Sequence, residues 1–240
     1  MARELRLTVS AVLLDIEGTI LSMSFVRETL FSYSRQHLPT FVAAHGHEPG
    51  VAAILEAARK LSGRPEALAA LVDWQERDEK APPLKAIQGL IWESGYVSGA
   101  FRAPIFPDAL AALRRWRQAG LPLHIYSSGS LKAQELIFRF NEAGDLRSLF
   151  AGHFDTGVGA KIDSASYARV ARAIGLPSQD ILFLSDDARE LTAARAAGLA
   201  AAQVVKETTK PDPRFPTLTD FADLQLISRV SVASAAASRG

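Results

Sequence analysis

The sequence predicts an α/β protein, in which a Rossmann-like parallel sheet has helices on both faces and an all-helical domain is inserted into it. In the second half of the chain, apolar runs of strand length alternate with helical stretches whose apolar residues recur three or four positions apart. This alternation is typical of a parallel sheet that helices cover on both sides. Between about residues 22 and 104 the alternation stops, and only helix-forming stretches are found.

Four apolar runs are expected to form the strands. In chain order they are LRLTVSAVLLDI, LPLHIYSS, DILFLSDD and LAAAQVV, and we interpret the first as a single strand. The helices between the later runs are DALAALRRWRQAG, LKAQELIFRF and SYARVARAIG. Gly120, Gly175 and Gly198 each close a helical run, at the place where a left-handed cap is needed.

The interruption of this pattern predicts a domain inserted after the first strand. Its helical stretches, FVRETLFSYSRQHLPTFVAAH and VAAILEAARKLSG among them, are punctuated by prolines and glycines. We therefore expect residues 1–21 and 105–225 to form the α/β core and residues 22–104 to form a helical cap. The small and polar residues of 226–240 predict a flexible tail.

Composition argues against several classes of partner and site. The chain has 27 basic and 26 acidic side chains, and the basic ones are scattered, so neither a nucleic acid nor a membrane is an expected partner. The absence of cysteine excludes disulfides, thiolate metal sites and a cysteine nucleophile. The charged start, MARELRLTVS, differs from a signal peptide, and no apolar segment has the length of a bilayer span. We expect a cytoplasmic protein with a small-molecule ligand.

Polar side chains follow three of the predicted strands at their carboxyl ends, where parallel α/β sheets bind ligands. A glycine-containing loop, GVGAKIDSASY, adds a lysine between the second and third of these strands. The candidate site residues are Asp15, Glu17, Ser127, Ser128, Lys161 and Asp186. Converging carboxylates repel one another unless a positive charge lies among them, and a hard cation with oxygen ligands, Mg2+, meets this need.

The same side chains suit a phosphate ester. The hydroxyls of Ser127 and Ser128 and the amides at the start of the following helix donate hydrogen bonds, while Lys161 offsets negative charge. Asp15 is then the nucleophile that forms an aspartyl-phosphate. Glu17 protonates the leaving oxygen and later deprotonates the water that breaks the intermediate. The residues therefore predict phosphoryl transfer from a small phosphate ester to water.

Four motifs in this order resemble those of the haloacid dehalogenase-like phosphatase superfamily: DIEGT, the serines of YSSGS, Lys161 and the aspartate of FLSD. The resemblance continues along nearly the whole chain. Glu17 stands where most of the superfamily has a second aspartate. Together with FVRETLF, PLKAIQGLIWESGY, IYSSGS, GHFDT and ILFLSD, it resembles the enolase-phosphatases of methionine salvage.

This resemblance implies a bifunctional reaction. The substrate 2,3-diketo-5-methylthiopentyl-1-phosphate is enolised and then dephosphorylated to 1,2-dihydroxy-3-keto-5-methylthiopentene. The implied catalytic residues are Asp15 and Glu17, and the implied metal ligands are Asp15, Asp186 and the main-chain carbonyl of Glu17. The implied substrate ligands are Ser127, Ser128 and Lys161. The resemblance further implies a haloacid dehalogenase-like fold, a Mg2+ cofactor and a monomer.

The chain departs from the family pattern at a few positions. Ile20 replaces a threonine, LFSYS replaces LFPY, and DDARE replaces a segment with fewer acids, but the expected metal and phosphate ligands are spared. We interpret Asp187 and Glu190 as a capping box at a helix start, and Ser130 as either a helix N-cap or a phosphate ligand. Two alternatives stay open: a Mg2+-dependent phosphatase of another small phosphate ester, and an inactive phosphate-binding protein.

Overall fold

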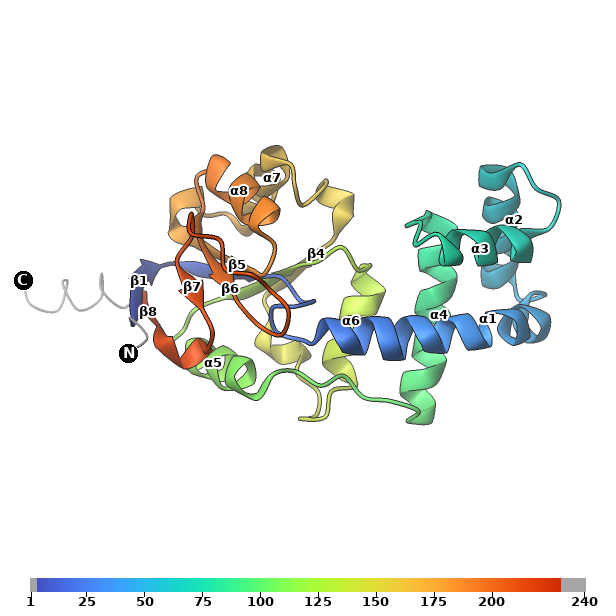
Figure 1. Cartoon of the computed structure of the whole chain (residues 1–240), viewed down its shortest axis with the longest axis horizontal. Coiled ribbons are helices and arrows are strands. Elements are labelled where there is room, and N and C mark those ends of the chain that lie inside the picture. The colour runs from blue at the N-terminus through green and yellow to red at the C-terminus, as the bar shows by residue number, and fades with distance from the viewer. Residues whose placement is uncertain (1–3, 230–240) are drawn as a thin grey trace, which may run out of the picture. The chain divides into compact units, whose positions relative to one another are not determined.

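The computed structural model describes residues 4–229 and divides the chain into two compact units (Figure 1). The first unit contains the residues up to Met23 and those from Ala103 onward, and the second is Ser24–Arg102. The first unit combines strands and helices, whereas the second is helical throughout. The chain leaves and re-enters the first unit at neighbouring points, because Leu21 and Ile105 form an antiparallel bridge and the Phe106 N–H donates to the Ile20 carbonyl at 2.9 Å.

The core of the first unit is a six-stranded sheet in the order β4-β3-β2-β5-β6-β7. Every neighbouring pair in it is parallel, which confirms the predicted fold class. The strands are β2 (Ala11–Leu14), β3 (Leu123–Tyr126), β4 (Gly152–Phe154), β5 (Ile181–Ser185), β6 (Ala200–Val204) and β7 (Thr217–Leu218).

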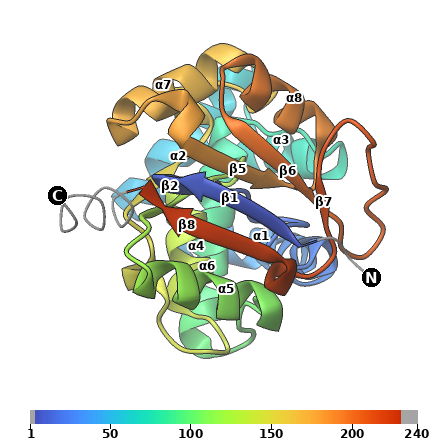
Figure 2. The same cartoon turned by 90° about the vertical axis from the view of Figure 1, so that its left-hand side faces the viewer.

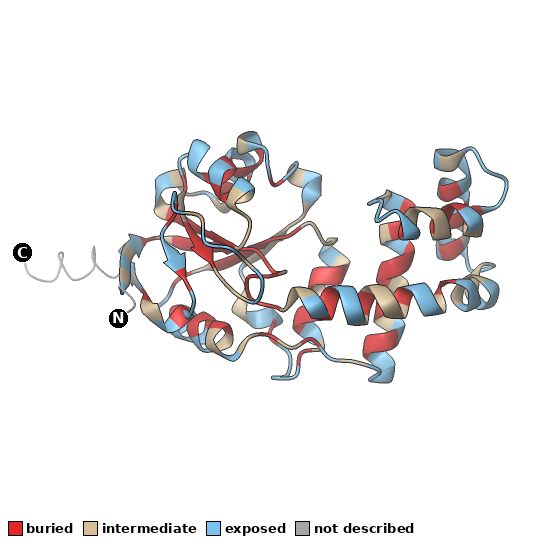
Figure 3. Ribbon diagram, in the orientation of Figure 1, coloured by how far each residue is buried: buried red, intermediate tan, exposed pale blue. Residues whose placement is uncertain are grey.

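Helices cover both faces of this sheet. Figure 2 shows α5 and α6 on one face and α7 and α8 on the other. Their bounds are α5 Pro107–Gln118, α6 Leu131–Arg139, α7 Ser164–Ile174 and α8 Ala188–Ala196. Because they are covered on both sides, β2, β3 and β5 are buried along their whole length (Figure 3). The three glycines expected to cap helices all have left-handed φ angles, between 79° and 89°.

The interpretation of LRLTVSAVLLDI as one strand is wrong. The run breaks at Ser10 into β1 (Leu5–Val9) and β2, and β1 pairs in parallel with β8 (Leu224–Ser228) in a separate two-stranded sheet. The physical reason is visible in the burial, since β1 alternates between half-buried and exposed residues whereas β2 is buried throughout. A half-exposed strand fits the margin of the unit better than the centre of a doubly covered sheet.

The prediction of a tail over residues 226–240 is wrong for its first three residues. Residues 226–228 belong to β8, because Leu226, Ile227 and Ser228 continue the parallel pairing with β1. Residues 230–240, the remainder of the predicted tail apart from Arg229, lie outside the described residues.

The second unit is built from helices that enclose an apolar core of their own. It starts with a π-helical segment, Phe25–Phe31, and continues with α1 (Ser32–His45), α2 (Pro49–Ser62), α3 (Ala67–Glu76) and α4 (Pro82–Ser98). Its core includes Leu38, Leu55, Leu71, Ile87 and Ile91. No strand occurs within Ser24–Arg102, all of which is described.

Across residues 4–229, no helix combines the length and the apolar character that crossing a membrane requires.

Candidate active site

A sharp turn after β2 carries the first two candidate residues. The Asp15 N–H donates to the Leu184 carbonyl at 2.9 Å, which continues the pairing of β2 with β5 by one residue. The chain then turns, with the N–H groups of Thr19, Ile20 and Leu21 all pointing to the Ile16 carbonyl. The strand thus ends in a backbone geometry that presents Asp15 at the carboxyl edge of the sheet.

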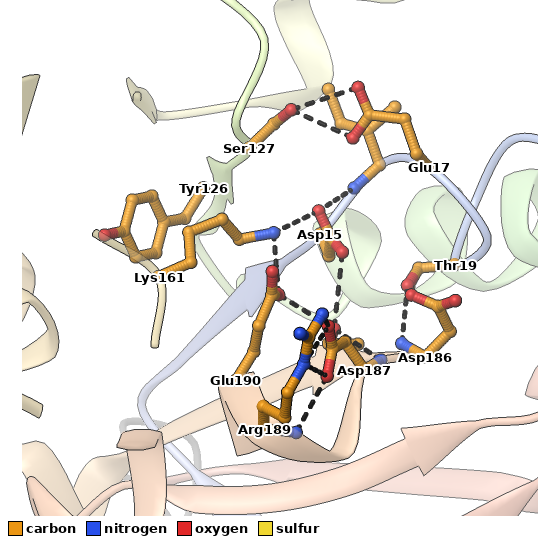
Figure 4. Close-up of polar contacts among 12 residues, drawn as sticks. Asp15, Glu17, Thr19, Tyr126, Ser127, Lys161, Asp186, Asp187, Arg189 and Glu190 are labelled. Atoms are coloured by element: carbon orange, nitrogen blue, oxygen red, sulfur yellow. Dashed lines mark hydrogen bonds and ion pairs between the residues drawn. The ribbon is translucent and has the colours of Figure 1, made fainter. Parts of the chain in front are cut away.

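The Asp15 carboxylate is buried and held by a buried ammonium group. Asp15 Oδ1 accepts from Lys161 Nζ at 2.5 Å and from the Ile16 N–H at 2.8 Å. Lys161 Nζ also contacts Glu190 Oε2 at 2.7 Å, so the lysine lies between two carboxylates (Figure 4). Burial lowers the pKa of Lys161, but the charges of Asp15 and Glu190 outweigh burial and leave the pKa raised. Lys161 therefore stays protonated across the neutral range.

Two tyrosines fix the loop that carries Lys161. The Tyr167 hydroxyl donates to the Lys161 carbonyl at 2.8 Å, and the Tyr126 hydroxyl donates to the Gly159 carbonyl at 2.9 Å. The Tyr126 ring also lies 5.8 Å from Lys161 Nζ, a distance at which the ring face attracts a cation. These contacts place the ammonium group rather than leaving it on a mobile loop.

Glu17 lies two residues beyond Asp15, but its side chain has a different partner. Figure 4 shows its carboxylate turned toward Ser127 and away from Asp186. The Ser127 hydroxyl donates to Glu17 Oε2 at 3.0 Å, and Ser127 Oγ accepts from the Gly129 N–H at 3.0 Å. Burial, and then the negative charge of Asp15, raises the pKa of Glu17. A raised pKa suits a carboxyl group that has to deliver a proton.

The loop after β3 leads into α6 through a serine cap. Ser130 Oγ accepts from the Ala133 N–H at 3.3 Å, so of the two roles left open for Ser130 the structure shows the N-cap. Ser128 is half-buried between Ser127 and this cap. The loop therefore brings hydroxyl groups and the amino end of α6 to the same edge as Asp15.

Asp186 follows β5 and packs against the Asp15 turn. Its N–H donates to Thr19 Oγ1 at 3.0 Å. Its carboxylate lies so close to Gly18 that a Cβ built on that glycine would be 2.5 Å from Asp186 Oδ2. Burial, followed by the charges of Asp15 and Asp187, raises the pKa of Asp186 to about 7. The end of β5 thus places a half-buried carboxylate beside the turn that carries Asp15.

The capping-box interpretation is right for Asp187 and wrong for Glu190. Asp187 caps α8 by accepting from the Arg189 N–H at 2.8 Å. Glu190, instead of reaching back to the Asp187 N–H, binds Lys161 and accepts from Ser185 Oγ at 3.0 Å. Burial and the charge of Asp15 raise the pKa of Glu190 to about 8.

Glu190 is thus a site residue that sequence reasoning missed. The signal in the sequence was its position in the first turn of the helix that begins directly after Asp186 and Asp187.

The six candidate residues occupy one edge of the sheet. Direct contacts join Asp15 to Lys161 and Glu17 to Ser127, whereas Asp186 is joined through the Asp15 turn. A family model described as haloacid dehalogenase-like hydrolase matches residues 9–198.

Curated proteins named enolase-phosphatase E1 are similar to the chain over nearly its whole length. The one from Bradyrhizobium sp. (strain BTAi1 / ATCC BAA-1182) is 54% identical over 220 residues, which are 92% of this chain and 96% of that protein. The chain belongs to the enolase-phosphatase E1 family of haloacid dehalogenase-like hydrolases. A more distant enolase-phosphatase E1, from Aquifex aeolicus (strain VF5), is 43% identical over 222 residues, 91% of this chain and 100% of that protein. The family expected from the motifs is confirmed.

Solved structures support the fold of this enolase-phosphatase. The UTR4 protein of Saccharomyces cerevisiae has a TM-score of 0.77 and 34% identity, with 89% of this chain and 98% of that chain covered. The structure of CbbY from Rhodobacter sphaeroides in complex with phosphate has a TM-score of 0.59 at 19% identity, with 89% of this chain and 95% of that chain covered. At that identity, the likeness to CbbY supports the fold alone.

Only some of the carboxylates at this site are placed where they could bind a cation. Within residues 4–229, no three Asp, Glu, His or Cys side chains are arranged to hold a metal ion, and Glu17 points its side chain toward Ser127. The carboxylates of Asp15 and Asp186 are the oxygen atoms that could serve a cation at this edge of the sheet. Burial and the charges of Asp15 and Asp187 raise the pKa of Asp186, and a hard cation bound there would favour its ionised form.

Proposed function

We propose that the chain is a bifunctional enolase-phosphatase, an acireductone synthase of methionine salvage. It converts 2,3-diketo-5-methylthiopentyl-1-phosphate into 1,2-dihydroxy-3-keto-5-methylthiopentene and phosphate. The observation that carries the proposal is the pairing of a buried, lysine-held Asp15 with a second acid, Glu17, whose pKa is raised. The 54% identity to an enolase-phosphatase E1 supports the choice of substrate.

Asp15 acts as the nucleophile. The Ile16 N–H and Lys161 Nζ both bind Oδ1, which fixes the position of the carboxylate. An Asp15 oxygen forms a bond to phosphorus while the bond from phosphorus to the ester oxygen breaks, which gives an aspartyl-phosphate and an alkoxide leaving group. Lys161 offsets the negative charge that gathers around the transferred group.

Glu17 moves the protons. Its raised pKa keeps a proton available for the leaving oxygen during the first step. The ionised Glu17 then takes a proton from the water that attacks phosphorus, and the P–O bond to Asp15 breaks. Inorganic phosphate leaves, Asp15 is restored as a carboxylate, and Glu17 is again protonated.

The phosphate is held by the loop after β3. Ser127 and Ser128 supply hydroxyl donors, the amino end of α6 supplies a favourable dipole, and Lys161 supplies charge. The Ser127 hydroxyl has a single hydrogen, which it donates to the Glu17 carboxyl group in this structure. Phosphate binding through this hydroxyl therefore frees the Glu17 carboxyl group to turn toward the leaving oxygen.

Mg2+ fits the remaining oxygen ligands. Asp15 and Asp186 would bind it through their carboxylates, and Glu17 through its main-chain carbonyl. When bound, the ion supplies positive charge that screens the phosphate oxygens from the attacking carboxylate. We further infer from the sequence a cytoplasmic monomer whose partner is the small phosphate ester, with neither nucleic acid nor membrane involved.

The decisive experiment compares the parent protein with Asp15→Asn on the diketo phosphate in the presence of Mg2+. The parent is expected to show the ultraviolet absorbance of the enol before phosphate appears. Asp15→Asn should release no phosphate but keep the parent's far-ultraviolet circular dichroism, because the two side chains have the same shape. Phosphate release from many other esters without an enol signal would instead identify a general phosphatase. Phosphate binding without turnover of any tested ester would identify an inactive binding protein.

A further inference from the structure

Two buried glutamines lie behind the loops that carry the phosphate and cation ligands. Gln134 on α6 is fully buried, and Gln203 on β6 is 2% exposed. Burying an amide is unfavourable unless all its hydrogen bonds are made, so a position that served packing alone would favour an apolar side chain. The partners of these two amides therefore indicate what they do.

Gln134 ties the phosphate loop to the end of β4. Its Nε2 donates to the Gly129 carbonyl at 3.1 Å and to the Phe154 carbonyl at 2.9 Å. Its Oε1 accepts from His153 Nδ1 at 3.0 Å. Because carbonyl oxygens only accept, the amide orientation is fixed by its partners.

The same carbonyl at the end of β4 also receives the loop directly. The Ser127 N–H donates to the Phe154 carbonyl at 3.2 Å. Gln134 and Phe154 thus restrain the loop at both Ser127 and Gly129, the two residues that orient the Ser127 hydroxyl.

Gln203 has the same arrangement on the cation side. Its Nε2 donates to the Asp186 carbonyl at 2.9 Å and to the Lys210 carbonyl at 3.1 Å. Its Oε1 accepts from the Asp212 N–H at 2.7 Å. The main chain of Asp186 is therefore fastened to β6 on one side and, through Thr19 Oγ1, to the Asp15 turn on the other.

We propose that Gln134 and Gln203 are positioning residues with separate tasks: Gln134 sets the affinity for phosphate by holding the Ser127 loop, and Gln203 sets the affinity for the cation by holding Asp186. Neither side chain touches the reacting atoms in this arrangement. The proposal rests on the proposed function for its assignment of the two loops. Removing a side chain that hydrogen-bonds to a ligand residue commonly lowers metal affinity or activity by roughly 10–100-fold.

The test measures two dissociation constants in three variants by isothermal titration calorimetry. The probes are Mg2+ alone and inorganic phosphate at saturating Mg2+. Gln134→Met should weaken phosphate binding about tenfold and leave Mg2+ binding unchanged. Gln203→Met should weaken Mg2+ binding about tenfold and leave phosphate binding unchanged once Mg2+ is saturating.

Gln75→Met is the matched control. Gln75 is also a buried glutamine, but it accepts from Ser34 Oγ at 3.0 Å within the helical unit. Its substitution should lower the melting temperature and move neither dissociation constant. The proposal is overturned if Gln134→Met and Gln203→Met shift both constants together, if neither shifts its own, or if Gln75→Met shifts them equally.

If a methionine variant does not fold, the corresponding asparagine variant is measured in its place. Gln134→Asn and Gln203→Asn keep a buried amide that is one methylene shorter, so it no longer reaches both carbonyls. The binding probes also separate this proposal from the proposed function. Suppose that the parent protein releases no phosphate from the diketo phosphate, yet each variant changes only its own dissociation constant. The positioning roles would then be supported and the proposed reaction refuted.

Discussion

Glu17 and Asp15 are two residues apart, yet their carboxylates have different surroundings and therefore different tasks. Asp15 is bound by Lys161, whereas Glu17 receives a single hydroxyl donor and has a raised pKa. Burial and a neighbouring like charge are the forces that separate the two roles. These surroundings support the proposed roles of Asp15 as the nucleophile and of Glu17 as the proton donor.

Glu17→Gln tests this division of labour. The amide keeps the shape of the side chain but has no proton to give, so kcat for the diketo phosphate should fall by about 10²–10⁴. With p-nitrophenyl phosphate, whose leaving group needs no proton, a rapid burst of nitrophenol should remain. The later breakdown of the aspartyl-phosphate, which needs a base, should stall. Rapid-mixing absorbance measurements distinguish the phases, and loss of the burst itself would contradict the assignment of Glu17 as the acid.

Gly18 illustrates how one missing side chain shapes the site. Its φ of +74° is left-handed, and a Cβ there would meet Asp186 Oδ2 at 2.5 Å. Gly63 has a similar φ of +69°, but a Cβ on Gly63 would meet no other atom within 4 Å. The two glycines share a backbone constraint and differ only in what surrounds them.

Gly18→Ala and Gly63→Ala should therefore distinguish the backbone strain that both substitutions cause from the displacement of Asp186 that only the first causes. Each is expected to lower the free energy of unfolding by about 1–2 kcal/mol, the cost of a left-handed non-glycine residue. Only Gly18→Ala should also raise the Mg2+ concentration needed for half-maximal phosphate release, because Asp186 has to move. Denaturant melts and Mg2+ titrations measure the two effects. Equal Mg2+ requirements in both variants would show that Asp186 is not a ligand.

At the scale of the element, strand β3 carries an unusual buried histidine. His124 is 8% exposed and packs against Gly152 on β4, where a Cβ would lie 2.9 Å from Nδ1. Within the described part of the chain, His124 Nδ1 has no hydrogen-bond partner. Burial, and then the charge of His153, lowers the pKa of His124 below its ordinary 6.5.

This lowered pKa predicts a loss of stability in mild acid. The unfolded chain takes up a proton near pH 6.5 while the folded chain resists it, so the free energy of unfolding is fully present above that pH and falls below it. Urea melts from pH 7.5 to 5.5 should show this fall, and it should be smaller in His124→Phe. Replacing the exposed His47 by glutamine serves as the control, and an equal pH slope in all three proteins would contradict the prediction.

The predictability of elements follows their burial and length. Strands β3, β5 and β6 were readable because each is a mostly apolar run inside a covered sheet. Strands β4 and β7 have three and two residues and leave no pattern of their own. The division at Ser10 was missed although LRLTV alternates apolar with polar residues and AVLL is apolar throughout, because the two segments are separated by one residue and their different pairing partners come from distant parts of the chain.

The site was predictable to the extent that its residues lie at strand ends. Asp15, Ser127 and Asp186 follow buried strands, so topology alone brings them to one edge. Glu190 was missed because its spacing of three residues from Asp187 predicts a capping box, yet the same position also allows its side chain to bind the buried Lys161. The choice between these depends on the position of Lys161, which comes from a distant loop.

At the scale of the whole molecule, the two units have separate apolar cores. Tyr167 and Phe183 belong to the core of the first unit, and Leu38 and Ile87 to that of the second. A unit with its own core is expected to unfold cooperatively by itself.

Scanning calorimetry should therefore resolve two transitions. Leu38→Ala removes a fully buried side chain and should destabilise the helical unit by about 2–5 kcal/mol, which lowers one transition only. Inorganic phosphate with Mg2+ should raise the other, since ligands stabilise the unit that binds them. A single transition that responds to both changes would show that the two cores unfold as one.

The bridge between Leu21 and Ile105 has an evolutionary consequence. An insertion whose first and last residues are neighbours can be exchanged as a cassette, because the host strands are left uncut and no connection has to be lengthened. Two genetic crossovers at these points would replace the whole helical unit and leave the residues of the first unit unchanged. An exchange of this kind would alter the inserted helical unit and leave the strands that carry Asp15, Ser127 and Asp186 as they are.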